Sequence, residues 1–258
     1  QLILEMEHVD DPTPADRGPT LRSAISALQA SASLRDACQC TCEGIKALTK
    51  LDGVMVYRFH EDEHGEVIAE AKDSRFAKYL GLHYPASDIP RQAREMFLMN
   101  WVRMIPLRDY QPVSLIGDAA SATPLDLGRS FLRSVSPVHI EYLRNMGVHA
   151  SLTLSLIEGG RLWGLIAGHH YDAPKHVPFE TRAACETLAR LLSSQLTHKA
   201  DLEVSGQRKR AKRVHRELVA QMKDREHPSE ALIGGEANVL DLLGCGGAGI
   251  AAPGGGWV

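Results

Sequence analysis

The sequence lacks any uninterrupted run of the roughly 18–20 apolar residues that a membrane-spanning helix needs, so we expect no membrane partner. The opening residues QLILEMEHVD contain neither a basic segment nor a long apolar one, and we expect no secretory signal. Basic residues are not in excess, since 29 Lys and Arg stand against 32 Asp and Glu, which argues against a nucleic-acid partner. Cysteines are few and odd in number, at five, which favours reduced thiols in a cytoplasmic protein over a disulfide framework.

The usual signatures of catalysis and metal binding are also missing. The patterns GxSxG, GxxxxGK, HExxH and CxxC do not occur, and no GxGxxG follows an expected strand. Cys38, Cys40 and Cys42 have no second cysteine pair to complete a tetrahedral zinc site, and their side chains diverge at helical spacing. His60 and His64 lie at an acidic turn, where we interpret them as solvated. We therefore expect neither a metal site nor an enzyme in this chain.

What is present is enough apolar sequence for a core, at 44% of 258 residues, and a clear helical period in several segments. The expected helices begin at Thr20 and cover residues 34–48, 91–100, 137–147 and 179–227. Thr20 is suited to cap the first helix, Gly147 to end the fourth and Pro228 to end the last. Because the chain begins at Gln and stops at GGGWV, we expect a fragment of a longer protein.

Alternating and continuous apolar runs predict strands. The expected strands are residues 1–10, 54–59, 66–71, 102–107, 149–157 and 161–170, with a further one begun near the carboxyl end. One hairpin turns at EDEHG, where Gly65 is able to take positive φ, and the other turns at Glu158-Gly159-Gly160. Three prolines predict a linker over residues 10–19, and Pro85 and Pro90 bracket a rigid, non-helical stretch. The expected class is α+β, with an antiparallel central sheet of about six strands flanked by helices and followed by a long connecting helix.

Several polar residues stand out in apolar surroundings. They are Asp88, Arg103, Arg133, Ser136, His139, Ser151, Thr153 and His169. Fixed cations and hydroxyls hold carboxylates by charge-assisted hydrogen bonds, and an acid with imidazoles suits a polar ring system. Aromatic side chains at Tyr57, Tyr84, Phe97 and Tyr142 are suited to enclose a flat apolar ligand. Structural interpretations stay open, with Arg133 as a helix cap, His139 as a core histidine, and Ser151 and Thr153 as strand surface.

Three segments resemble the GAF domain of phytochromes, above all bacteriophytochromes. They are VMVYRFHEDEHGEVIAE, YPASDIPRQAREMF and LRSVSPVHIEYLRNMGVHASLTLSLIEGGRLWGLIAGHH, and PASDIP and SPxHxxYLxNMGV are the most specific motifs. The segment LILEME resembles the end of the PAS domain that precedes the GAF domain in the family. The segment NVLDLLGCGGAGI resembles the start of the PHY domain that follows the GAF domain. The resemblance implies a PAS end and linker over 1–19, a GAF domain over 20–200, a connecting helix over 201–227 and a truncated PHY start over 228–258.

The resemblance implies a linear tetrapyrrole ligand, biliverdin in bacteriophytochromes, and a red/far-red photoreceptor. The backbone carbonyl of Asp88 would face the pyrrole N–H groups and a central water, with His139 on the other side of that water. Arg103 and Arg133 would hold the two propionates. A cationic bilin in an apolar pocket needs such acceptors, and its two propionates need two cations.

The remaining positions carried over by the resemblance line the same cavity. Ser151 and Thr153 would be hydroxyl partners of the propionates, and His169 would bind the carbonyl of ring D. The further lining residues are Tyr57, Tyr84, Ile89, Phe97, Ser136 and Tyr142.

Two positions depart from the family pattern. Val138 stands where plant and cyanobacterial relatives carry their attachment cysteine, and the attachment thiol of bacteriophytochromes lies upstream of these residues. We therefore expect non-covalent biliverdin binding by this chain. Phe97 stands where bacteriophytochromes often have tyrosine, which removes a hydroxyl near ring D.

The resemblance also implies partners beyond this chain. A homodimer through the GAF and connecting helices is expected, with a downstream histidine kinase or response regulator. One alternative is a GAF domain that binds a cyclic nucleotide or another small ligand and regulates an attached enzyme. Another is a purely structural dimerisation module, for which the leucines at 188, 191, 192 and 196 could form the contact, unless they pack in the core.

Overall fold

The computed structural model describes residues 2–7, 17–116, 125–223, 232–243 and 245–249. The chain divides into two compact units, residues 1–197 and 198–258, and each is described by itself. Most of the predicted linker, the helix end predicted at Pro228 and the strand predicted near the carboxyl end lie outside the described residues.

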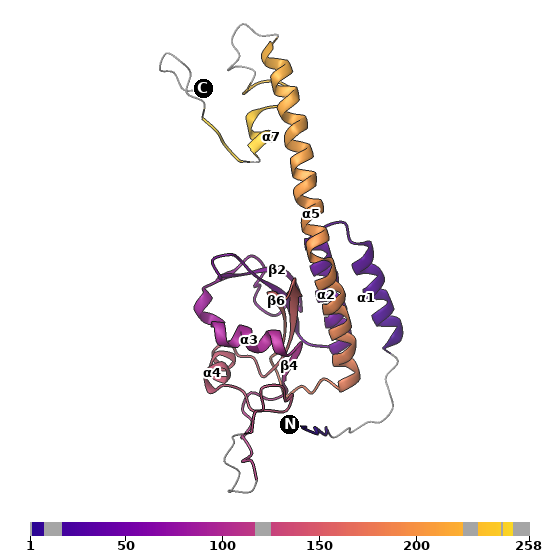
Figure 1. The fold of residues 1–258 in the computed structure, drawn as a ribbon, viewed down its shortest axis with the longest axis vertical. Helices are drawn as coiled ribbons and strands as arrows, with labels where there is room; N and C mark the ends of the chain where they lie inside the picture. Colours follow the sequence, from indigo (N-terminus) through magenta and orange to yellow (C-terminus); the bar gives the residue numbers. More distant parts are fainter. Residues whose placement is uncertain (1, 8–16, 117–124, 224–231, 244, 250–258) are drawn as a thin grey trace. The chain divides into compact units, whose positions relative to one another are not determined.

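A single antiparallel sheet of six strands organises the first unit (Figure 1). The strands are β1 Gly53–Phe59, β2 Gly65–Lys72, β3 His83–Tyr84, β4 Val102–Ile105, β5 Ala150–Glu158 and β6 Arg161–His170. Their order across the sheet is β3-β2-β1-β6-β5-β4, and every neighbouring pair is antiparallel. The α+β class and the sheet of about six strands are confirmed.

Helices cover the sheet on both sides. These helices are α1 Gly18–Ala30, α2 Leu34–Thr49, the 3-10 turn η1 Ala86–Asp88, α3 Arg91–Met99, α4 Pro137–Asn145 and the first part of α5 Phe179–Lys223. The second unit contains the rest of α5 and the short helix α7 Val239–Leu243. In Figure 1, α1, α2 and the first part of α5 lie on one side of the sheet, and α3 and α4 on the other. The first helix begins two residues before the predicted Thr20, because Pro19 is tolerated in a first turn, where its missing N–H has no helical partner.

The apolar core lies between the sheet and the first set of helices. Alternate residues of the central strands, among them Val54, Val56, Leu152, Leu154 and Ile166, point to this side. They pack against α1, α2 and α5, and the leucines of α5 at 188, 192 and 196 are fully buried among them. These leucines could have formed a dimer contact or packed in the core, and the structure shows that they pack in the core.

Three local predictions are wrong. Residues 2–7 are not a strand, because they pair with no edge of the sheet, and their glutamates instead bind side chains and loops of this unit. In the first hairpin turn the residue at positive φ is Glu63, not Gly65. Gly65 is needed for space, since a Cβ there would lie 1.7 Å from Cζ of Tyr57. The stretch between Pro85 and Pro90 contains one 3-10 turn.

The second hairpin follows its prediction. Gly159 and Gly160 have φ of 54° and 77°, as the tight turn between β5 and β6 requires. In the second unit, Val214 and Leu218 of α5 form a small apolar cluster with Ala237. Across the described ranges, no helix combines the length and apolarity that crossing a membrane requires.

Candidate functional site

The face of the sheet opposite the helical core carries a concentration of polar side chains. In the register of β4 with β5, Arg103 pairs with Thr153, and in the register of β5 with β6, Ser151 pairs with His169. Paired residues of antiparallel strands point to the same side, and so do residues two apart on one strand. The sheet therefore brings these four predicted residues together on one face, the side on which α3 and α4 lie.

The two predicted arginines are close enough to affect each other electrostatically. Arg103 is mostly buried, and desolvation, with a further contribution from the charge of Arg133, lowers its pKa to about 10. Its Nη1 donates to the carbonyl of Ser130 at 3.1 Å. Burial also lowers the pKa of Arg133, whose Nε is buried without a hydrogen-bond partner. Two partly desolvated cations with an unused donor form a site that favours an anion.

The histidines lie further along the same face. His169 is 6% exposed, and its Nδ1 is buried with no hydrogen-bond partner. Burial, with a smaller contribution from His139, lowers the pKa of His169 to about 4. Desolvation also lowers the pKa of His139, although part of its surface remains open to solvent. Both imidazoles are therefore neutral at pH 7, and His169 keeps an unused polar atom toward this face.

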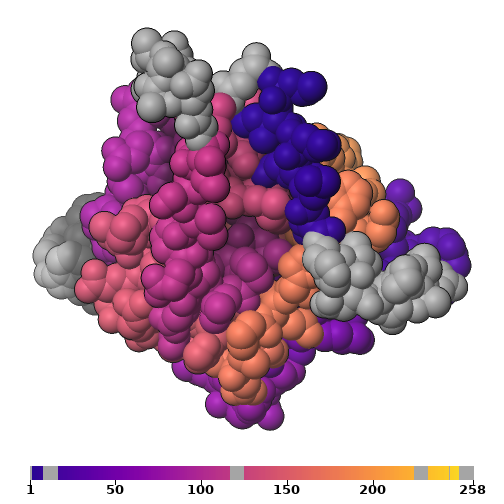
Figure 2. Space-filling model, turned by 90° about the horizontal axis from the view of Figure 1, so that it is seen from below, coloured from indigo at the N-terminus to yellow at the C-terminus, as the bar shows by residue number. Residues whose placement is uncertain are grey.

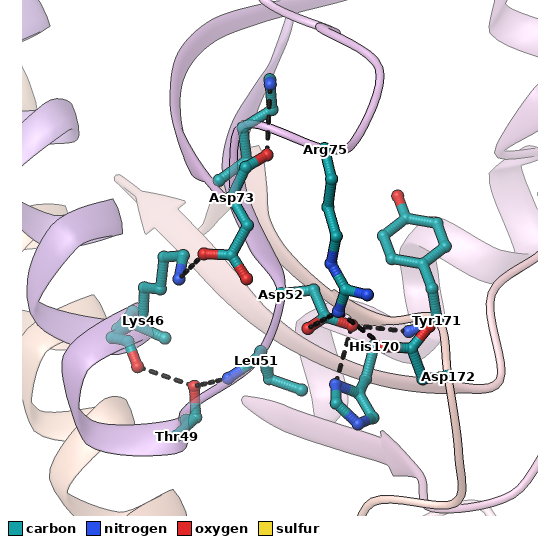
Figure 3. A network of polar contacts seen from close by, with 11 residues as sticks. Lys46, Thr49, Leu51, Asp52, Asp73, Arg75, His170, Tyr171 and Asp172 are labelled. Carbon is teal, nitrogen blue, oxygen red and sulfur yellow. Dashed lines mark hydrogen bonds and ion pairs between the residues drawn. The ribbon is translucent and has the colours of Figure 1, made fainter.

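A buried carboxylate fixes the end of β6 that carries His169. The backbone N–H of Asp52 donates to the carbonyl of His169 at 3.0 Å, and Oδ2 of Asp52 accepts from the N–H of Tyr171 at 2.8 Å. Nδ1 of His170 lies 2.9 Å from the same oxygen. Arg75 adds a longer contact to Asp52 and bridges to Asp172 (Figure 3). These contacts bind the strand ends to the loop after β2 and hold the His169 backbone in place.

Aromatic side chains gather at the β1 and β3 end of this face. The ring of Tyr57 lies 5.2 Å from that of Phe59 and 5.9 Å from that of Tyr84, and Ile89 packs against the same cluster. Burial, with the charge of Asp88 as the next cause, raises the pKa of Tyr57 to about 12. Burial raises the pKa of Tyr84 to about 12 as well.

Asp88 and Tyr142 complete this aromatic end. Burial, with the charge of Asp88 as the next cause, raises the pKa of Tyr142, so both lie within electrostatic reach of each other. The ring of Tyr142 lies 6.3 Å from that of His139 in a nearly parallel orientation. The predicted aromatic wall, the acid and the imidazole therefore occupy one region.

Two predicted residues have a less direct place in the site. Phe97 is half-buried on α3, and its carbonyl accepts from the hydroxyl of Ser155, which shares the polar face of β5 with Ser151 and Thr153. Ser136 is exposed at the N-cap position of α4 and makes no side-chain cap there.

Sequence analysis missed Arg94, which supports the loop that carries Asp88. Its Nε donates to the carbonyl of Ile89 at 2.7 Å, and Nη2 donates to the carbonyl of Ala86 at 3.3 Å. Its guanidinium also lies 4.4 Å from the ring centroid of Phe59. The available signal was the position of Arg94 in the first turn of a helix that follows Pro90, where a long side chain reaches back over the preceding loop.

The cysteines lie away from this face. Cys38, Cys42 and Cys185 belong to the helical core, as predicted for buried thiols, and burial raises the pKa of Cys185 to about 12. Cys40 is half-buried on α2, and Cys245 is exposed in the second unit. Within the part of the chain that the structure describes, no group of three or more His, Cys, Asp or Glu side chains is arranged to hold a metal ion.

The turn histidines follow their prediction only in part. The side chains of His60 and His64 remain 29% and 31% exposed, so they reach solvent as predicted, but their rings also stack 4.3 Å apart, which was not predicted. Nε2 of His60 lies 3.0 Å from Glu66, and Nε2 of His64 lies 3.0 Å from Nδ1 of His83. The reason is that β3 pairs with the start of β2 and brings His83 over the turn, a contact between distant segments that local spacing does not reveal.

Comparison with known protein families identifies the domain class of the first unit. The family model described as the GAF domain matches residues 33–198, which is more than half of the chain. The first unit is therefore a GAF domain.

Relatives and solved structures show which proteins with a GAF domain this chain is similar to. Cyanobacterial phytochrome B of Nostoc sp. is 44% identical over 232 residues, which cover 89% of this chain and 31% of that relative. The photosensory core module of the Stigmatella aurantiaca phytochrome is 42% identical with a TM-score of 0.73, over 93% of this chain and 48% of that one. The chromophore-binding domain of a Stigmatella aurantiaca bacteriophytochrome is 47% identical with a TM-score of 0.68, over 69% and 59%. The chain belongs to the GAF domain family and is similar to the GAF chromophore-binding region of phytochromes, and it spans about a third of the length of the curated relative.

Proposed function

We propose that this chain is the bilin-binding, light-sensing module of a phytochrome and that its ligand is biliverdin. The observation that carries this proposal is a pair of partly desolvated arginines: Arg103 on the same face of the sheet as the unpartnered Nδ1 of His169, and Arg133 within electrostatic reach of Arg103. Buried donors and cations without partners are costly, so a face that keeps them is suited to a ligand that supplies the missing acceptors.

The order of the residues across the face matches a ligand with carboxylates on one side and a polar ring on the other. Arg103 and Arg133 would bind the two propionates, with Ser151 and Thr153 as neutral donors beside them. His169 would donate to, or accept from, a polar atom of a terminal ring. Tyr57, with Tyr84, Ile89, Phe97 and Tyr142 around the same region, would enclose the ring at its faces.

Asp88 and His139 would serve the centre of the ligand. When bound, a bilin supplies absorption of red light and a double bond that isomerises on excitation. A carboxylate and backbone carbonyl at Asp88 would favour protonated pyrrole nitrogens, because an opposite charge and acceptors raise the pKa of a buried base. The neutral His139 would donate from one ring nitrogen and accept at the other across the site.

Biliverdin would be held without a covalent bond in this chain. The cysteines of the first unit are Cys38, Cys40 and Cys42 on α2 and Cys185 on α5, all among the helices on the far side of the sheet from Arg103 and His169. We expect a denatured gel band of the biliverdin-loaded chain to show no zinc-induced bilin fluorescence. A fluorescent band would reveal a covalent bond and overturn this part of the proposal.

Signalling would leave through α5, whose first turns pack beneath the sheet and which continues to Lys223. We propose a cytoplasmic homodimer through the GAF and connecting helices, with a histidine kinase or response regulator as the downstream partner. The chain itself would not be catalytic.

The direct test is a titration of the purified chain with biliverdin, followed by absorbance. We expect a saturable band at the red end of the spectrum, and we expect the Arg103→Met, Arg133→Met double variant to lose most of it at the same ligand concentration. Arg108→Met is the matched control, because Arg108 lies just after β4 and binds the carbonyl of Val148 and the side chain of Asp109. A wild-type chain that stays colourless, but is stabilised by a cyclic nucleotide, would favour the alternative ligand class.

A further inference from the structure

The segment before α1 places one carboxylate directly on the loop between the arginines. Both oxygens of Glu5 accept hydrogen bonds: Oε1 from the hydroxyl of Ser130 at 2.5 Å and from the N–H of Leu132 at 2.7 Å, and Oε2 from the N–H of Phe131 at 2.9 Å. Figure 2 shows this indigo segment lying beside the pink loop region and the orange start of α5. Three donors from three consecutive residues converge on a single side chain.

That loop contacts Arg103 and leads directly into Arg133. Arg133 follows Leu132 directly, and the carbonyl of Ser130 accepts from Nη1 of Arg103 at 3.1 Å. The loop has no helix or strand of its own, and while the N–H of Ser130 donates to the carbonyl of Leu127, those of Phe131 and Leu132 find their acceptor in Glu5. Glu5 supplies that acceptor, and its position therefore affects where both guanidinium groups lie.

The charges agree with this geometry. The charge of Glu5 raises the pKa of Arg103, against desolvation and the repulsion from Arg133, which lower it. Although desolvation raises the pKa of Glu5, the hydrogen bonds from Leu132, Ser130 and Phe131 lower it more, so Glu5 is ionised at neutral pH. A fixed anion beside two neighbouring cations reduces the cost of holding them together.

A second glutamate anchors the segment. Glu7 binds the guanidinium of the buried Arg182 with both oxygens, and its Oε2 lies 3.1 Å from Nε2 of His176. Arg182 in turn lies over the ring of Phe131, 4.2 Å from its centroid, so it contacts the same loop that Glu5 binds. The segment is therefore held at two points, and the position of Glu5 is fixed.

We propose that Glu5 is a positioning residue for the ligand, one that holds the loop over residues 130–132 so that Arg103 and Arg133 are preorganised for two carboxylates. This inference rests on the proposed bilin function and adds the segment before α1 to the site. Preorganisation raises affinity because the loop need not be ordered when the ligand binds.

The test compares two ligands in the full 258-residue chain. We expect Glu5→Ala to weaken biliverdin binding about tenfold, the loss typical of removing hydrogen bonds to a charged group. Biliverdin dimethyl ester, whose propionates carry no charge, should bind the variant and the wild type equally. Glu5→Gln, which keeps one acceptor oxygen, should fall between the two. Met6→Ala is the matched control, since Met6 lies between the two glutamates and its side chain is 80% exposed.

The outcomes separate the two proposals. Equal biliverdin affinity of Glu5→Ala and the wild type, or the same loss for biliverdin and its ester, would overturn the positioning role. Binding of the ester also reports whether a variant is folded, because a variant that fails to fold loses both ligands. If Glu5→Ala fails to fold, Glu5→Gln still tests the positioning role with a milder substitution. A wild-type chain that binds neither ligand would instead overturn the proposed function.

Discussion

Replacing Arg103 by methionine separates a functional arginine from a structural one. The folded chain holds this guanidinium at a pKa of about 10 instead of 12.5, chiefly because of desolvation and then because of Arg133. A difference of that size corresponds to about 3 kcal/mol of destabilisation, which the remaining exposure of the side chain reduces to about 2 kcal/mol. Methionine preserves the volume and removes the charge, so this cost disappears.

The substitution also removes a stabilising contact. The hydrogen bond from Nη1 to the carbonyl of Ser130 is worth about 1–2 kcal/mol. The two effects nearly cancel, so we expect the free energy of unfolding of the ligand-free Arg103→Met variant to lie within about 1 kcal/mol of the wild type. Biliverdin affinity, by contrast, should fall at least about tenfold, because one propionate loses its cation.

Urea denaturation followed by circular dichroism gives the stability, and a biliverdin titration gives the affinity. Arg108→Met is again the control, and we expect the opposite pattern: lower stability, because the carbonyl of Val148 loses its donor, and unchanged affinity. If Arg103→Met were strongly destabilised and still bound biliverdin normally, Arg103 would be structural and the argument from its desolvation would be wrong.

Three further predictions concern other parts of the face. The pKa of His169 is about 4 in the folded chain, below the ordinary histidine value of 6.5, so the unfolded state takes up a proton first as the pH falls. The free energy of unfolding should therefore drop by about 2 kcal/mol between pH 7 and pH 5, and His169→Gln should remove most of that drop in urea titrations at the two pH values. Gly65→Ala should lower the free energy of unfolding by about 1–3 kcal/mol in the same assay and weaken biliverdin binding, because the new Cβ would displace the ring of Tyr57. A variant as stable as the wild type would contradict this packing of Tyr57 against Gly65. Asp88→Ala should still bind biliverdin but lose the far-red product after red illumination, and a normal photocycle would refute the role of Asp88.

The polar face could be predicted from local pattern because a strand alternates its faces. Ser151 and Thr153 are two apart, and each strand residue between them and beside them is apolar, so one face had to be polar. The second hairpin was equally clear, because Gly159 and Gly160 leave little choice of turn. Placing Arg103 beside Thr153 required the register of β4 with β5, which the sequence does not contain in any local form.

What sequence analysis missed are contacts between distant segments. The alternation around Glu5 and Glu7 predicted a strand, but those side chains bind Ser130 and Arg182, more than a hundred residues away. His83 reaches the turn histidines only because β3 pairs with β2. In each case the residue types were visible, while the partner depended on the fold.

The most direct test of the account is a difference spectrum of the chain with biliverdin, red light minus far-red light. The account predicts a band in the red that decreases under red illumination while a far-red band grows, and that returns under far-red illumination. A biliverdin spectrum that is the same after both illuminations would contradict the claim that this face holds a photoactive bilin.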